Sequence, residues 1–417
     1  MSTQVQLQDR LTIRGIEFKN RIIKGAMSEA LANDAGQPNQ DLVSLYDQWG
    51  KGGLGCAITG NVMVDARAKN EPGVVVLENE RDLTRMKQWA EVGKRHGMVQ
   101  LIQLSHPGRQ CPRGLNKETV APSAVPFSSA LSTTFGTPRA LSEVEILDII
   151  RRFGESARLA KKAGFEGVQL HGAHGYLISQ FLSPLTNQRQ DQWGGSIDNR
   201  MRFLLEIYKE VRQQTGDDFI IAVKMNSADF QRGGFSEEDA INVAKAVADA
   251  GMDLIEISGG TYEAPAMAGA KAKQRKESTI AREAYFLEFA ETIREHVSCP
   301  LMVTGGFRTV KGMNDALASG ACDFVGIARP FGVEPYLPNQ LMRGEDVKYA
   351  VKPIKTGIKP LDKMAIMEIV WYAAQFKTIA DGKQPNPNLS PLKVLFNYSR
   401  RNIKTVLTGK LNSRKSA

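Results

Sequence analysis

Eight apolar, strand-like runs that alternate with amphipathic stretches are the feature that most limits how this chain folds. A strand that is joined through a helix to the next strand pairs with it in parallel, with a right-handed crossover. Eight such units favour a closed barrel over an open, doubly wound sheet. The predicted strands are Arg21–Met27, Leu54–Val64, Met98–His106, Phe165–Gly172, Asp218–Asn226, Met252–Ser258, Pro300–Gly306 and Cys322–Ala328.

Short signals at the helix ends support this alternation. A hydroxyl residue followed three positions later by an acid, as in Ser142…Glu145 and Ser236…Asp239, is typical of a capping box. Glycines at Gly164, Gly251 and Gly320 suit left-handed C-caps just before the next strand. The predicted helices cover residues 40–50, 81–96, 142–163, 199–215, 236–250, 280–297 and 309–319.

The sequence therefore predicts an α/β fold, a (β/α)8 TIM barrel over residues 1–345 that begins with a short hairpin at 11–19. The βα alternation stops near residue 345, so residues 346–417 are expected to form a helical extension. An apolar helix is predicted over Asp362–Ala380, and a basic amphipathic helix over residues 391–410.

The charge of the chain is concentrated at its C-terminal end. The net charge is +9, and residues 391–417 hold seven basic residues and no acidic one, so the first 390 residues carry only +2. This near-neutral body argues against nucleic acid binding. The basic tail suits peripheral contact with a membrane surface, or docking on the barrel or on a partner subunit, which we favour because helix amphipathicity usually reflects packing.

Several classes of protein are excluded by the spacing of particular residues. The four cysteines are far apart and form no C-x-x-C pair, which argues against zinc ribbons, iron–sulfur clusters and disulfide scaffolds. The G-x-G-x-x-G pattern at Gly50–Gly55 follows a helix and precedes a strand, the reverse of a dinucleotide-binding fingerprint. No signal peptide is visible, and no apolar run approaches the roughly 20 residues of a membrane span. We expect a cytoplasmic protein, with peripheral membrane contact as the open alternative.

Three polar side chains crowd the end of the fourth predicted strand, where a barrel of this type has its active site. They are His171, His174 and Tyr176. Imidazoles donate hydrogen bonds to a carbonyl oxygen, and a tyrosine hydroxyl can deliver a proton. Because no third ligand stands at metal-binding spacing, we predict a catalytic cluster without a metal.

The segment around these residues resembles the Old Yellow Enzyme family of NADH:flavin oxidoreductases. It reads H-G-A-H-G-Y-L-I-S-Q-F-L-S-P, followed by N-Q-R-Q-D-Q-W-G-G-S and N-R. The likeness extends over about residues 5–340, with matching motifs at 20–27, 102–109, 304–307 and 326–329. The resemblance implies a barrel that binds FMN without a covalent bond, with NADH or NADPH as a transient reductant.

The resemblance also implies where the flavin would bind. Ser28 would donate a hydrogen bond to the reduced ring, Gly60 would leave room for the ring edge, and Gln103 would bond to the pyrimidine. Lys224, in the place usually held by arginine, would set a positive charge near flavin N1. The implied flavin contacts are Ala26, Met27, Ser28, Gly60, Gln103, Lys224, Gly305, Gly306, Ala328 and Arg329, of which the last four would bind the phosphate.

By the same resemblance the substrate is a small activated alkene, such as an enone, an enal or a nitroalkene. His171 and His174 would hold its oxygen while hydride passes from flavin N5 to the β-carbon, and Tyr176 would protonate the α-carbon. Other residues of the signature are expected to form an ion-pair and turn network: Arg189, Asp191, Gly194, Gly195, Asn199 and Arg200.

Two departures from the family pattern leave other functions open. Ala26 replaces a usual proline and Lys224 replaces arginine, and long segments at 107–140 and 260–279 are expected near the mouth of the barrel. One alternative is an FMN-dependent oxidase or dehydrogenase that acts on a bulkier substrate. Another is a flavin-binding accessory protein at the membrane surface. The sequence leaves open the physiological substrate, the choice between NADH and NADPH, and whether the chain forms a homo-oligomer.

Overall fold

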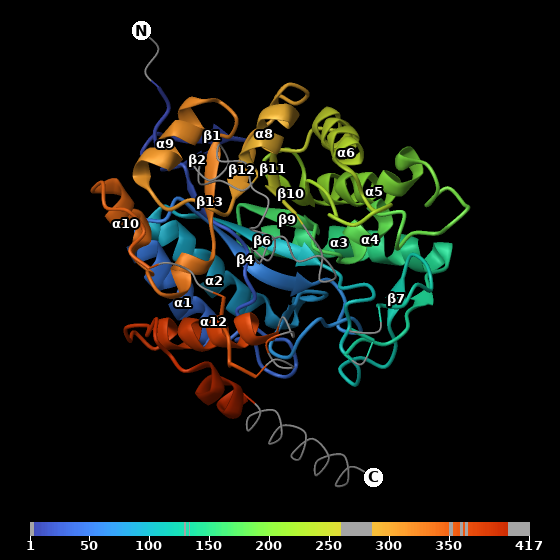
Figure 1. Cartoon of the computed structure of the whole chain (residues 1–417), viewed down its shortest axis with the longest axis horizontal. Helices are drawn as coiled ribbons and strands as arrows, with labels where there is room; N and C mark the ends of the chain where they lie inside the picture. The colour runs from blue at the N-terminus through green and yellow to red at the C-terminus, as the bar shows by residue number, and fades with distance from the viewer. Residues whose placement is uncertain are drawn as a thin grey trace.

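Eight parallel strands close into a barrel in the computed structural model of the chain (Figure 1), which describes residues 4–128, 131–132, 134–259, 286–349, 353–358, 362 and 366–398. The first strand, β3, pairs both with the last strand, β13, and with the next one, β4, and this closes the cylinder. The predicted (β/α)8 barrel is therefore confirmed. Its strands are β3 (Ile22–Lys24), β4 (Cys56–Met63), β6 (Val99–Ser105), β9 (Gly167–Gly172), β10 (Ile220–Asn226), β11 (Leu254–Ser258), β12 (Leu301–Thr304) and β13 (Phe324–Ile327). A two-residue strand, β5 (Val75–Val76), pairs with the C-terminal end of β4.

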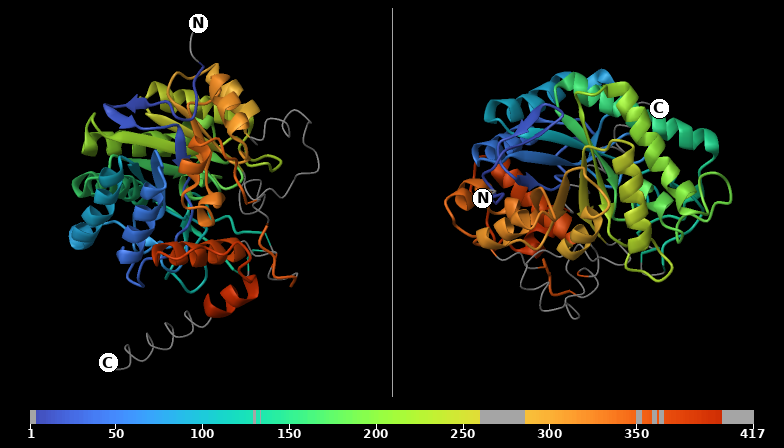
Figure 2. Two further views of the ribbon diagram at one scale, coloured as in Figure 1. Left: turned by 90° about the vertical axis from the view of Figure 1, so that its left-hand side faces the viewer. Right: turned by 90° about the horizontal axis from the view of Figure 1, so that it is seen from above.

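The helices lie around the outside of these strands (Figure 2). Both predicted capping boxes are present, at Ser142 and Ser236, and the glycines at the three predicted helix ends have positive φ angles of 75–100°. Of the predicted helix 280–297, residues 280–285 lie outside the described residues. The helices are α1 (Gln40–Lys51), α2 (Leu83–His96), α3 (Glu143–Ala163), α4 (Leu177–Leu182), α5 (Ile197–Thr215), α6 (Glu237–Asp249), α8 (Leu287–Arg294), α9 (Val310–Ala318), α10 (Leu337–Met342) and α12 (Ile366–Ala380).

The interior of the barrel changes from apolar to polar along the strands. The predicted hairpin, β1 (Leu11–Ile13) with β2 (Ile16–Phe18), packs against the apolar end, where Phe18 lies 4.9 Å from Phe324 between ring centroids. Because side chains alternate along a strand, every second residue after these apolar ones also points into the barrel, nearer the C-terminal strand ends. They are polar: Gln103, Gln169, His171, Lys224, Asn226, Glu256, Ser258 and Thr304. The N-terminal end of the barrel is therefore apolar and excludes water, whereas its C-terminal end, the mouth, is polar.

The C-terminal extension docks on the barrel through α12, which lies beside α1 (Figure 1). The rings of Phe376 and Trp49 pack edge to face at 5.5 Å, and Tyr372 lies against Gly332 of the short 3-10 helix η4 (Arg329–Gly332). Apolar packing on α1 and η4 explains why so apolar a helix forms here. The division into a barrel over residues 1–345 and an extension over 346–417 stays a prediction.

The basic helix predicted over residues 391–410 is described only as far as residue 398. Residues 391–398 are helical, with Val394 buried, whereas Leu392 and Phe396 are 48% and 62% exposed. The predicted apolar face is therefore only partly packed in this stretch, and residues 399–417 lie outside the described residues. Within the part of the chain that is described, no helix has the length and apolar character needed to cross a bilayer. Peripheral membrane contact and homo-oligomer formation stay predictions.

Candidate active site

Three side chains that follow one another along the chain meet at the polar mouth of the barrel. His171 points inward from β9, His174 sits in the turn that follows, with a φ of 61°, and Tyr176 caps α4. The His171 ring lies 5.3 Å from the His174 ring and 4.5 Å from the Tyr176 ring, measured between centroids. The structure therefore brings the predicted catalytic residues together.

Both histidines are neutral in this environment. Burial is the main cause that lowers the pKa of His174, to about 3, and that of His171 well below its ordinary value, and the charge of Lys224 acts in the same direction. His174 Nε2 lies 2.8 Å from Ser258 Oγ, and its backbone N–H donates to Asn226 Oδ1 at 3.1 Å. His171 Nδ1 is buried and has no protein partner among the described residues, so it is available to a ligand.

Two asparagines contact the hydroxyl of Tyr176. Asn61 Nδ2 donates to Tyr176 Oη at 3.3 Å, and Asn70 Nδ2 donates to it at 3.2 Å. Asn61 lies near the C-terminal end of β4, a position whose polarity could have indicated a site residue. Asn70 lies in the loop after β4, where no local signal pointed to it. Sequence reasoning found neither residue.

A chain of buried polar side chains crosses the barrel below the histidines. Gln103 Nε2 donates to Gln169 Oε1 at 2.8 Å, and Gln169 Nε2 donates to Glu256 Oε2 at 2.7 Å. Glu256 is fully buried, and its Oε1 accepts from Thr304 Oγ1 at 2.7 Å and lies 2.9 Å from Lys224 Nζ. Lys224 is therefore paired with a carboxylate that sequence reasoning missed, although Glu256 occupies an inward position of β11.

The segment after β3 packs closely against β4 at Gly60. A Cβ atom added to Gly60 would lie 2.3 Å from the Met27 carbonyl oxygen and 2.1 Å from Glu29 Oε2. The Gly60 N–H donates to Glu29 Oε1 at 2.9 Å, and Tyr46 Oη donates to the same oxygen at 2.6 Å. Packing of the protein on itself thus explains this glycine, and its contact with the flavin stays a prediction.

The ends of β12 and β13 form a site suited to an anion. Gly305 and Gly306 both have φ angles of 99°, a left-handed conformation that lets the backbone turn sharply. Arg329 begins η4, and its guanidinium lies 3.7 Å from Glu368 of α12. The Gly305 N–H donates to the Gly326 carbonyl oxygen at 3.2 Å, so the donors that a phosphate would meet here are the Gly306 N–H and the Arg329 guanidinium. These donors and the sharp turn fit the phosphate of FMN.

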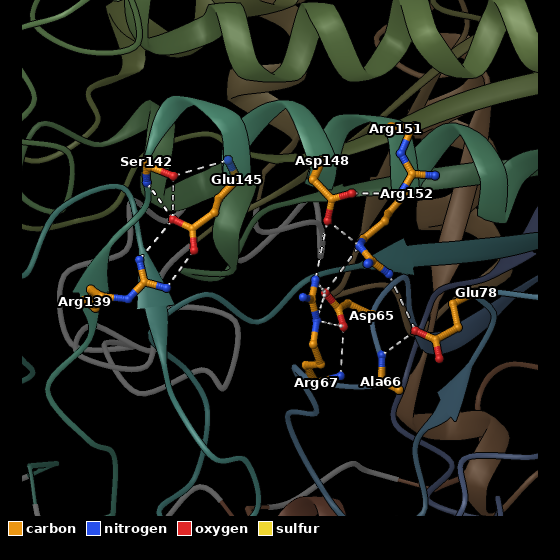
Figure 3. A network of polar contacts seen from close by, with 10 residues as sticks. All are labelled: Asp65, Ala66, Arg67, Glu78, Arg139, Ser142, Glu145, Asp148, Arg151 and Arg152. Atoms are coloured by element: carbon orange, nitrogen blue, oxygen red, sulfur yellow. Dashed lines mark hydrogen bonds and ion pairs between the residues drawn. The ribbon is translucent and has the colours of Figure 1, made fainter.

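The loop that carries Asn70 is fastened to α3 by ion pairs (Figure 3). Arg67 pairs with Asp65 at 2.6 Å and with Asp148 of α3 at 3.4 Å. Arg152, also of α3, pairs with Asp148 at 2.7 Å and with Asp65 at 3.6 Å. These contacts hold the loop at one edge of the mouth.

The long segment after β6 lies against the same site, as predicted for residues 107–140. Gln110 Nε2 donates to the His174 carbonyl oxygen at 2.8 Å. The Asn116 side chain accepts from the Lys69 N–H at 2.9 Å and donates to the Lys69 carbonyl oxygen at 2.7 Å. The other long segment, 260–279, lies outside the described residues.

The remaining charged and polar residues of the signature form the expected network. Arg189 pairs with Asp191 at 2.5 Å and donates to the Leu141 carbonyl oxygen at 2.6 Å. Asn199 donates to the Gly194 carbonyl oxygen at 3.1 Å, and the buried Arg200 pairs with Asp239 at 3.0 Å. They hold the loop that follows α4, so their role is structural.

Comparisons with known proteins agree with this fold. A profile of the NADH:flavin oxidoreductase / NADH oxidase family matches residues 7–347. The chain is 38% identical over 360 residues to the NADH-dependent flavin oxidoreductase iliE of Hypocrea jecorina (strain QM6a), with 81% of this chain and 89% of that protein covered. It is 34% identical over 407 residues to the NADH-dependent flavin oxidoreductase iccE of Talaromyces variabilis, with 90% and 98% covered. A solved structure of an old yellow enzyme homologue from Zymomonas mobilis matches the fold with a TM-score of 0.71 at 24% identity, over 85% and 96% of the two chains.

The barrel and its mouth define a flavin-dependent oxidoreductase, and the chain belongs to the NADH:flavin oxidoreductase family, that of the Old Yellow Enzymes. The family predicted from the signature segment is thereby confirmed. The protein is an FMN-dependent oxidoreductase that uses NADH or NADPH as reductant, acts on small molecules, and binds its flavin without a covalent bond.

Proposed function

We propose that this enzyme reduces the C=C bond of activated alkenes, such as enones, enals and nitroalkenes. The observation that carries the proposal is the close packing of the buried His171 ring with the part-buried His174 ring at 5.3 Å and with the Tyr176 ring at 4.5 Å, measured between centroids. A neutral imidazole donates an N–H to a carbonyl or nitro oxygen without adding a charge to the site. A phenol is a proton donor suited to a carbanion that has just formed.

In the mechanism that we propose, FMN, when bound, would supply the redox chemistry by carrying hydride from NADH or NADPH to the substrate. His171 and His174 bind the electron-withdrawing oxygen of the substrate and so orient its β-carbon. Tyr176 Oη gives its proton to the α-carbon and later regains one from solvent. The apolar side chains at the N-terminal end of the barrel exclude water from that side of the site.

The cofactor contacts are part of the same proposal. Ser28 would donate to the flavin ring, Gln103 would bond to its pyrimidine side, and Lys224 would balance negative charge on the reduced ring while it stays paired with Glu256. Arg329 would bind the phosphate together with the Gly306 N–H, and Gly305, whose own N–H donates to Gly326, would shape the turn around it. The full proposed set is Ala26, Met27, Ser28, Gly60, Gln103, Lys224, Gly305, Gly306, Ala328 and Arg329.

The substitution Tyr176→Phe tests the proposal by separating the two half-reactions. We expect flavin reduction by NADH to stay within about twofold of wild type, and reoxidation by 2-cyclohexenone to slow about 100-fold or more, since positioned proton transfer contributes roughly 10²–10⁴-fold. Both rates are measured by anaerobic stopped-flow absorbance. Tyr336→Phe is the matched control, because Tyr336 is exposed and bonds to Gln48 on the outer surface. Equal loss of both half-reactions in Tyr176→Phe would contradict the role of this tyrosine.

A further inference from the structure

The hydroxyl oxygen of Tyr176 receives two hydrogen bonds from the protein. Asn61 Nδ2 and Asn70 Nδ2 both donate to it, at 3.3 and 3.2 Å. A hydroxyl oxygen has two lone pairs and one hydrogen. When the lone pairs accept from the two amides, the hydroxyl hydrogen has to point away from both asparagines. The same two donors stay in place when the oxygen becomes negatively charged.

Asn70 is held in place independently of Tyr176. The residue before it, Lys69, is bonded through both its backbone N–H and its carbonyl oxygen to the side chain of Asn116. Further back, the ion pairs of Asp65 and Arg67 fasten the loop to α3 (Figure 3). The amide is therefore preorganised by contacts that do not involve the tyrosine.

We infer that Asn61 and Asn70 are positioning residues that orient the Tyr176 hydroxyl and stabilise the phenolate left after it has given up its proton. The inference rests on the proposed alkene reduction. In that step the Tyr176 O–H bond breaks, and its proton joins the α-carbon through the electron pair that the hydride addition has left there. The electron pair of the O–H bond stays on Oη until solvent returns a proton. Two preorganised donors at the developing charge favour this transfer.

The test uses the FMN-bound enzyme carrying tyrosine labelled with ¹³C at Cζ, with the Tyr176 resonance identified by its absence from Tyr176→Phe. Asn70→Leu removes both N–H donors and keeps a similar volume. We expect it to move the Tyr176 resonance and to slow reoxidation by 2-cyclohexenone about 10- to 100-fold, as the loss of one hydrogen bond to a charged oxygen predicts. Flavin reduction by NADH should stay within about twofold of wild type. Asn61→Leu should act in the same direction.

Two further variants keep the test decisive. Asn388→Leu makes the same substitution at an exposed residue that follows α12, and we expect it to leave both the resonance and the reoxidation rate unchanged. Asn70→Asp keeps the shape of the side chain but replaces the donating NH₂ by an acceptor, so it should slow reoxidation at least as much as Asn70→Leu. A resonance and a rate in Asn70→Leu and Asn70→Asp that match wild type would overturn the inference, as would an equal effect of Asn388→Leu.

Failure of the proposed function has a different signature. If the natural oxidant is not an alkene, wild type itself is not reoxidised by 2-cyclohexenone. The Tyr176 resonance would still move in Asn70→Leu and not in Asn388→Leu, which would support the hydrogen bonds to the phenol oxygen while rejecting the reaction.

Discussion

Replacing Glu256 by glutamine removes one charge from the buried pair with Lys224 and changes the shape of the side chain very little. The two charged atoms lie 2.9 Å apart, and the side chains are 0% and 5% exposed. Breaking such a pair leaves a buried charge without compensation, which costs about 3–5 kcal/mol. An unfolding entropy of about 2.1 cal/mol/K per residue over the 417 residues amounts to about 0.9 kcal/mol/K. We therefore expect the Tm to fall by about 3–6 °C.

The assay is thermal unfolding at saturating FMN, followed by far-UV circular dichroism, for Glu256→Gln, Lys224→Met and the double variant. Each single variant leaves one buried charge unpaired, whereas the double variant leaves none. We expect the double variant to be more stable than either single variant. A Glu256→Gln variant as stable as wild type, or a double variant that loses the sum of the two single losses, would refute the view that each charge compensates the other.

Two further predictions concern pH and cofactor binding. Burial lowers the pKa of His106 from 6.5 to about 4, although Asp65 acts in the opposite direction. The unfolded chain therefore binds more protons than the native state between these pH values, and stability falls as the pH drops from about 6.5 to 4, by up to about 3 kcal/mol. His106→Gln should reduce this loss, measured as the change in urea midpoint between pH 7 and pH 4.5. Arg329→Ala should weaken FMN binding about 10- to 100-fold, the worth of charge-assisted bonds to phosphate, while riboflavin, which has no phosphate, binds as to wild type in a fluorescence titration.

Each of these two predictions has an outcome that would contradict it. An acid sensitivity of His106→Gln equal to that of wild type would mean that this histidine does not couple folding to protons in that range. A parallel loss of FMN and riboflavin affinity in Arg329→Ala would show that the arginine supports the ring site and not the phosphate.

The fold could be predicted from the sequence because its signals are local. Each barrel strand is an apolar run followed by a turn and an amphipathic helix, and each capping signal lies within four residues. The predicted strand over Arg21–Met27 is longer than the observed β3, Ile22–Lys24, and Pro300–Gly306 is longer than β12, Leu301–Thr304. The residues predicted beyond the C-terminal ends of these two strands leave the sheet at the mouth, where the flavin contacts are proposed.

The candidate site was predictable only where its residues are neighbours in the chain. His171, His174 and Tyr176 lie within six residues and carry the family signature. Asn61 and Asn70 lie 115 and 106 residues from the tyrosine that they contact, so only closure of the barrel brings them to it. Sequence patterns give no information on contacts at such separations.

The partner of Lys224 was missed for a related reason. Glu256 follows an apolar residue in β11 and reads as one polar residue of an alternating strand. The pairing of Glu256 with Lys224 depends on the register between β10 and β11, which places the two residues side by side. That register emerges from the closed sheet and not from either strand alone.

The central claim is that this barrel passes hydride from a nicotinamide through its flavin to an activated alkene. The most direct measurement is the visible absorption spectrum of the FMN-bound protein, first after anaerobic addition of NADH or NADPH and then after addition of 2-cyclohexenone. The account predicts that the flavin bands bleach with the nicotinamide and return fully with the enone, with cyclohexanone as the product. Bleaching that the enone does not reverse would contradict alkene reduction.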